Sequence, residues 1–191
     1  MSTQRGTTLL ILARNAIAEA LGVRRQACAD AAWLDSPGAC FVTLTQNGDL
    51  RGCIGSLEAS RPLRADVQAN ARAAAFRDPR FPPLTLEDYQ TVHVEVSVLS
   101  PAVPLRFDSE QHALTQLRPG IDGVVLEYGR LRSTFLPQVW EQLTEPHAFM
   151  AYLKQKAGLR ADFWHADMKL SRYSVEKWCE HDRNETRPES P

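Results

Sequence analysis

The sequence predicts an α+β protein built from antiparallel sheets with flanking helices. Two hairpins are indicated, because Asn47-Gly48 and Gly129-Arg130 each separate two runs of strand-forming residues. Segments with helical apolar spacing occur between the strands, but they lack the regular strand–helix–strand alternation of parallel sheets. Hairpin signals therefore dominate, and they favour antiparallel pairing.

The N-terminal part is predicted to contain one helix followed by the first hairpin. Apolar residues recur at helical spacing over 9–20, and Gly22 follows as a natural stop. Residues 41–45 are rich in β-branched and aromatic side chains, so they are expected to pair with residues 50–55 across the turn.

A second helix is expected from Pro62 to Phe76, since proline is tolerated in a first helical turn. Its inward stripe combines four apolar positions with one amide: Leu63, Val67, Asn70, Ala71 and Ala74. A buried amide needs hydrogen-bond partners. Three prolines stiffen the loop over 78–83, and residues 92–98 alternate as a strand with one apolar and one polar face.

The C-terminal half continues the mixed pattern. It predicts a helix over 109–117, a hairpin of 124–128 with 131–136, helices starting at Pro137 (to about 143) and at Pro146, and a final strand region over 168–178. Beyond Cys179 the chain is polar and contains two prolines. We therefore predict one domain over 1–180 and a disordered tail over 181–191.

Composition disfavours several classes of function. The net charge is −1, from 22 basic and 23 acidic residues, so nothing indicates binding to nucleic acid or to an anionic membrane. The apolar run over 9–13 is too short to span a membrane and lacks a signal-cleavage site. The four cysteines contain no C-x-x-C pair and the five histidines no metal-ligand spacing, so no metal or cofactor is predicted. A cytoplasmic location with reduced thiols is expected.

The most informative stretch is residues 50–55, Leu-Arg-Gly-Cys-Ile-Gly, called the hexapeptide below. Alternation predicts Arg51 and Cys53 on one face of the strand, with Leu50 and Ile54 on the other. A guanidinium beside a thiol favours the nucleophilic thiolate, and a glycine within a strand marks close approach of a backbone or a ligand. Cys53 is therefore a candidate nucleophile. The alternative is a buried structural cysteine, which is the common state of free thiols.

Two further pairs are candidates. His93 and Glu95 share the polar face of one strand and could serve as base and orienting partner, although a solvated face is the favoured interpretation. Asp78 and Arg80 flank Pro79 in the stiff loop, so they could present charges to a ligand at little entropic cost. Equally, these two could pair with each other or cap the preceding helix.

The hexapeptide also resembles the hallmark of the AMME chromosomal region candidate protein family, whose bacterial members are called AmmeMemoRadiSam system protein A. The resemblance continues in order along the chain, from about residue 8 to residue 178. It includes residues 78–84, residues 94–99, Gly123-Val124, residues 135–139 and Lys156-Ala157-Gly158.

The resemblance implies an α+β fold with a larger and a smaller lobe and with the hexapeptide at a cleft between them. It also implies two companions, a Memo-like protein related to non-haem dioxygenases and a radical S-adenosylmethionine enzyme. Two functions follow. The first is an accessory module whose cleft binds an unknown small molecule or peptide through Arg51, Gly52, Ile54, Gly55, Asn70, Asp78, Arg80 and Glu95. The alternative is a thiol-dependent enzyme with Cys53 as nucleophile and Arg51 supporting its thiolate.

Overall fold

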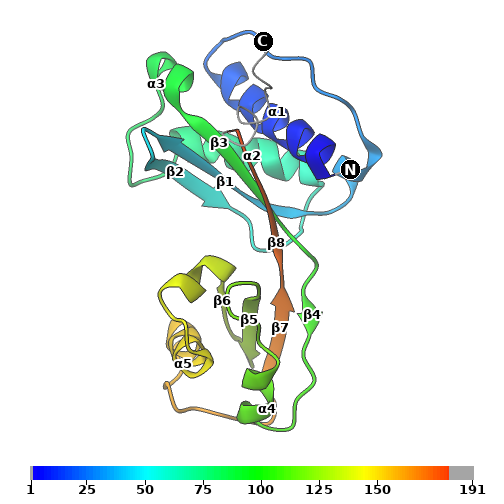
Figure 1. Ribbon diagram of the computed structural model, residues 1–191, viewed down its shortest axis with the longest axis vertical. Coiled ribbons are helices and arrows are strands. Elements are labelled where there is room, and N and C mark those ends of the chain that lie inside the picture. The colour runs from blue at the N-terminus through cyan, green and yellow to red at the C-terminus, as the bar shows by residue number, and fades with distance from the viewer. Residues whose placement is uncertain (1, 181–191) are drawn as a thin grey trace, which may run out of the picture. The chain divides into compact units, whose positions relative to one another are not determined.

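The computed structural model describes residues 2–180, and the predicted disordered tail lies outside them. The chain forms two compact units. Unit 1 contains the described residues up to 99 and those from 176 onward, and unit 2 contains residues 100–175. Each unit has its own four-stranded sheet and its own hydrophobic core. Figure 1 labels the helices and strands of both units. The predicted α+β class with antiparallel sheets and flanking helices is confirmed, whereas the single domain over 1–180 stays a prediction.

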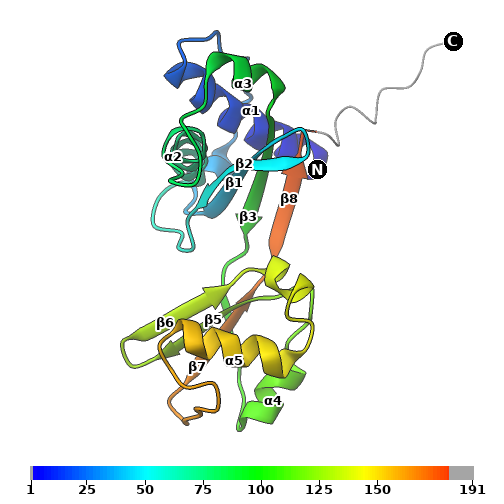
Figure 2. The same ribbon diagram turned by 90° about the vertical axis from the view of Figure 1, so that its left-hand side faces the viewer.

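The sheet of unit 1 has the strand order β2-β1-β3-β8, and α1 and α2 pack together on one of its faces (Figure 2). Its elements are α1 (Ser2–Ala20), the 3-10 helix η1 (Ala32–Asp35), β1 (Ala39–Gln46), β2 (Asp49–Gly55), α2 (Leu63–Phe76), α3 (Leu86–Thr91), β3 (His93–Leu99) and β8 (Val175–Cys179). β1 pairs antiparallel with both β2 and β3. The hexapeptide therefore lies on β2, at one edge of this sheet.

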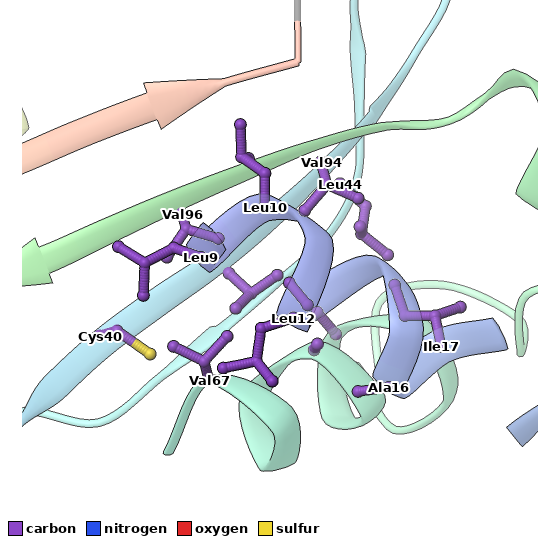
Figure 3. Packing of buried hydrophobic residues seen from close by; sticks show 14 of the residues in the cluster. Leu9, Leu10, Leu12, Ala16, Ile17, Cys40, Leu44, Val67, Val94 and Val96 are labelled. Atoms are coloured by element: carbon purple, nitrogen blue, oxygen red, sulfur yellow. The ribbon is translucent and has the colours of Figure 1, made fainter. Parts of the chain in front are cut away.

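The core of unit 1 forms because apolar stripes on two helices meet the apolar face of the strands. Figure 3 shows side chains from α1, α2 and the sheet in this cluster, among them Leu12, Val67 and Val96. All five positions of the stripe predicted on α2 are buried. α1 begins at Ser2 rather than at residue 9, and this added segment of about two turns lies against β8, because Gly6 leaves room there for the ring of Trp178.

The first hairpin turns as predicted. Asn47 has a φ of 55° and Gly48 a φ of 89°, the left-handed conformation that both residues tolerate. The strand register then shifts by one residue: Leu44 lies opposite Gly52, whereas Thr45 lies opposite Leu50. Arg51 is thus the extra residue of a β-bulge.

The bulge interrupts the alternation of side chains along β2. Because Leu50 lies opposite Thr45, it takes the same face of the sheet as Cys53. The predicted placement of Leu50 on the face of Ile54 is therefore wrong. Ile54 itself packs against the core of unit 1, as expected for the helix-covered face.

Unit 2 is organised around a sheet with the strand order β4-β7-β5-β6. Its elements are β4 (Val103–Pro104), α4 (Glu110–Thr115), β5 (Gly123–Tyr128), β6 (Leu131–Phe135), the 3-10 helix η2 (Pro137–Glu141), α5 (Pro146–Lys156) and β7 (Lys169–Tyr173). The predicted hairpin forms between β5 and β6. In the core, the ring of Trp140 stacks on Phe149 with 3.8 Å between the centroids.

Two predictions for the elements need correction, and two short elements were not predicted. The helix expected from Pro137 to 143 is a short 3-10 helix that ends at Glu141. The strand region expected over 168–178 is divided into β7 and β8, which belong to different sheets. Neither η1 nor the two-residue strand β4 was predicted, because both are too short to produce a periodic pattern.

Candidate functional site

Cys53 begins a row of polar side chains across the sheet of unit 1. It lies opposite Thr43 of β1, which on its other side lies opposite Glu95 of β3. The Lys177 amine of β8 is 3.2 Å from the Glu95 carboxylate. Because the neighbouring Val42 is buried in the core, alternation places Thr43 and the other residues of this polar row on the face away from α1 and α2.

The Cys53 thiol is half-buried and accepts a hydrogen bond from the Thr43 hydroxyl, with 3.3 Å between Oγ1 and Sγ. By contrast, Cys40 is fully buried in the core of unit 1 and packs there as a small apolar side chain. Burial raises the pKa of the Cys40 thiol far above its ordinary value. Of the four cysteines, all described and all free thiols, Cys40 is buried and the other three are partly exposed.

The backbone of Cys53 is held by the stiff loop that follows α2. The Asp78 carboxylate accepts a hydrogen bond from the Cys53 N–H at 2.9 Å, and the Arg80 guanidinium donates to the Cys53 carbonyl at 3.2 Å. Asp78 and Arg80 also pair with each other at 2.7 Å. We call this arrangement the clamp. Since β2 is an edge strand, the clamp satisfies backbone groups that no further strand pairs.

The two side chains of the clamp differ in exposure. Asp78 is 1% exposed, and its hydrogen bonds from Arg80 hold the pKa of its carboxyl well below the usual range. Arg80 is 53% exposed, so part of its guanidinium faces solvent. The alternative in which Asp78 and Arg80 pair with each other therefore describes the geometry, and Arg80 alone keeps an exposed surface for a ligand.

Arg51 does not serve Cys53 in the way the sequence suggested. Its guanidinium donates to the Pro82 carbonyl at 2.9 Å and to the Asp88 carboxylate at 3.2 Å. The Arg51 side chain is only 11% exposed. The positive charge of Arg51 is consequently paired with α3, and Arg80 is the cation bound to the Cys53 backbone.

The two glycines of the hexapeptide make room for this chain's own atoms. A Cβ on Gly52 would collide with the backbone carbonyl oxygen of Ala74, so this glycine lets α2 approach the strand closely. A Cβ on Gly55 would collide with the ring of Phe41. Both glycines are thus explained by packing within unit 1.

Asn70 occupies a buried polar network between α2 and β1. Its amide donates to the Cys40 carbonyl at 3.0 Å, to the Ser56 hydroxyl at 3.1 Å and to the Asp66 carboxylate at 3.0 Å. Asp66 is itself buried and accepts bonds from the Cys40 N–H and from Arg61. The network satisfies the amide, as its burial requires. Sequence reasoning missed Asp66, although it lies one helical turn before Asn70.

The predicted pair of His93 and Glu95 is separated from Cys53 by the strand register. Glu95 shares the row of Cys53, but β1 lies between them, which puts their backbones roughly 10 Å apart at the usual strand spacing. His93 lies opposite Thr45, one row further along. The structure therefore places neither side chain next to the thiol as a base.

Among residues 2–180, no group of three or more His, Cys, Asp or Glu side chains is arranged to hold a metal ion. No helix in this part of the chain is long and apolar enough to cross a membrane.

Comparison with known proteins gives consistent matches over most of the chain. The AMMECR1 family model matches residues 10–178. Protein MJ0810 of Methanocaldococcus jannaschii is 40% identical over 141 residues, which cover 72% of this chain and 70% of the relative. A protein of Methanothermobacter thermautotrophicus is 37% identical over 185 residues, 92% of this chain and 94% of the relative.

A solved structure agrees as well. The crystal structure of uncharacterized protein PH0010 from Pyrococcus horikoshii superposes with a TM-score of 0.75 at 32% identity, covering 97% of this chain and 94% of the other. The resemblance first seen at the hexapeptide thus extends along the sequence and the fold. This chain belongs to the AMMECR1 family.

Proposed function

We propose that this protein is an accessory binding component of an AmmeMemoRadiSam-type system, in which the hexapeptide strand contacts a small molecule or a peptide segment. The observation that carries the proposal is the clamp. Asp78 and Arg80 use their charges to hold the backbone of Cys53, and Arg51 is paired with Asp88. These groups rigidify an edge strand rather than assemble a nucleophile with its base.

The surface beside the clamp is suited to a polar ligand. The exposed part of Arg80 donates hydrogen bonds, and the polar row offers the Thr43 hydroxyl and the Glu95–Lys177 ion pair. Preorganised donors and acceptors of this kind reduce the entropic cost of binding. A ligand that combines acceptors with donors, as a peptide backbone does, is therefore preferred.

We further propose that the protein acts in the cytoplasm with a Memo-like protein and a radical S-adenosylmethionine enzyme as companions. Family membership supports this assignment of partners. Four free thiols are compatible with a reducing compartment.

The test is binding of the two companions from the same genome, measured by titration calorimetry and by co-purification. We expect association with at least one of them, weakened roughly tenfold or about 1.4 kcal/mol by Arg80→Gln or Lys177→Ala. Arg160→Gln is the matched control, because Arg160 is an exposed arginine in a similar carboxylate pair within unit 2. If neither companion binds, or if Arg160→Gln weakens binding as much as the other two substitutions do, the proposal is contradicted.

A thiol-dependent enzyme is the second candidate, and one observation favours it. Cys53 is half-buried, with a hydroxyl at its sulfur and a guanidinium bound to its peptide. Alkylation of the native protein separates the two functions.

A further inference from the structure

Unit 1 contains a concave site that is lined by no residue of the hexapeptide, the clamp or the polar row. It is a cavity of about 530 Å³ between α1, α2 and the segment that follows α1. This volume is within the range of small-molecule sites. Leu12, Ala16 and Ala27 supply its apolar wall, and Gln68 of α2 contributes a carboxamide that can donate and accept hydrogen bonds.

The wall formed by the segment after α1 is held in place by a reciprocal pair of hydrogen bonds. The Asn15 amide donates to the Gln26 carbonyl at 2.9 Å, and the Gln26 N–H donates to the Asn15 side-chain oxygen at 2.8 Å. These bonds attach an irregular segment to the side of α1. The cavity is therefore built by specific contacts.

The charges at one end of the cavity do not balance. The Glu19 carboxylate accepts a hydrogen bond from Arg72 at 2.6 Å. Arg25 lies 3.7 Å from the same carboxylate, which is too long for a hydrogen bond, and its side chain is 61% exposed. One carboxylate thus faces two guanidinium groups, and the donors of Arg25 remain available to an added anion.

We propose that this cavity binds a small organic carboxylate with an apolar body. Arg25 receives the carboxylate of the ligand, the wall of Leu12, Ala16 and Ala27 covers its apolar part, and Gln68 bonds a polar group such as an amide. This site is separate from the hexapeptide surface, so its occupancy is independent of the function proposed above.

The test uses N-acetyl-leucine as the probe, because it combines a carboxylate, an amide and an apolar side chain. Its neutral counterpart, N-acetyl-leucinamide, lacks only the charge. We expect the native full-length protein to bind the acid roughly tenfold more tightly than the amide in calorimetry or NMR titration. Absence of binding by the acid, or equal affinity for both compounds, would overturn the proposal.

Variants then assign the binding to the cavity. Arg25→Gln should reduce affinity for the acid roughly tenfold. Arg24→Gln is the matched control, since it removes a neighbouring arginine that does not line the cavity. Gln68→Ala, which leaves every charge in place, should also weaken binding. Equal affinities in the Arg25 and Arg24 variants, or full affinity in the Gln68 variant, would contradict the assignment.

Discussion

The backbone of Cys53 is held on both sides by one loop, with Asp78 at its N–H and Arg80 at its carbonyl. Sequence reasoning selected all three residues and left open whether the two charges pair with each other or serve a ligand. It could not place the loop against the strand, because 25 positions separate Cys53 from Asp78 and the contact depends on how α2 packs. For the same reason Arg51 seemed available to the thiol, although Asp88 binds it.

The clamp should contribute measurably to stability. Asp78→Asn keeps the shape of the side chain but removes the charge from a buried acceptor of hydrogen bonds from Cys53 and Arg80. Hydrogen bonds to charged groups contribute about 1.5–3 kcal/mol, so we expect the free energy of unfolding in urea to fall by about 2 kcal/mol. Asp162→Asn, in an exposed pair with Arg160, is the control and should change little. A similar loss in both variants would contradict the role of the clamp.

The lowered pKa of Asp88 should make the free energy of unfolding depend on pH. Hydrogen bonds, led by the Thr85 N–H and including one from Arg51, lower its pKa to about 2, whereas an unfolded Asp titrates near 3.9. Because the unfolded chain then binds the proton more readily, the stabilisation is complete above about pH 4 and is lost as the pH falls toward 2. The unfolding free energy measured from pH 5 to pH 2 should therefore decline more steeply for the native protein than for Asp88→Asn. Parallel curves would refute this assignment.

At the scale of elements, sequence patterns predicted the features that depend only on neighbouring residues, such as turns and buried helix faces. The turn at Asn47-Gly48 and the buried stripe of α2 are both confirmed. The bulge at Arg51 and the division of 168–178 into β7 and β8 were not predictable, because each depends on which strand lies alongside. Which strands pair with one another is decided by the assembled sheet and not by the sequence of a single segment.

Gly52 gives a sharp test of the contact between β2 and α2. Gly52→Ala should destabilise the protein by roughly 1–3 kcal/mol, because the new methyl group meets the Ala74 carbonyl oxygen, which cannot rotate away. Ala74→Gly should not relieve this loss, since the backbone oxygen remains. By contrast, Phe41→Leu should relieve part of the loss caused by Gly55→Ala, because there the obstacle is a side chain. The thermal unfolding of each double variant should be compared with that of its single variants. Relief by Ala74→Gly, or no relief by Phe41→Leu, would contradict this packing.

At the scale of the whole molecule, the described residues form two hydrophobic clusters that share no residue, one in each unit. The resemblance implied two lobes, and periodicity alone did not reveal them. The reason is physical: β3 leaves unit 1 and β8 returns to it, so the unit is assembled from segments that lie far apart in the sequence.

The separate cores predict local effects of core mutations. Leu153→Ala removes a fully buried side chain from the cluster of unit 2 and should cost about 2–5 kcal/mol. We expect amide hydrogen exchange to accelerate more in β5 than in β3, because openings of unit 2 become more frequent. Leu131→Ala, at a 40% exposed leucine of the same unit, is the control. Equal acceleration in both strands would show that the two cores open together.

Alkylation of the native protein by iodoacetamide, followed by peptide mass spectrometry at pH values from 5 to 9, tests whether the clamp holds the strand of Cys53 or activates its thiol. If the charges around Cys53 hold its strand rather than activate its sulfur, then at pH 6 Cys53 should react no faster than free glutathione, and Cys40 should stay unlabelled until denaturation. Rapid labelling of Cys53 at pH 6, ahead of Cys28 and Cys179, would contradict a purely structural role of these charges and would favour the thiol-dependent enzyme.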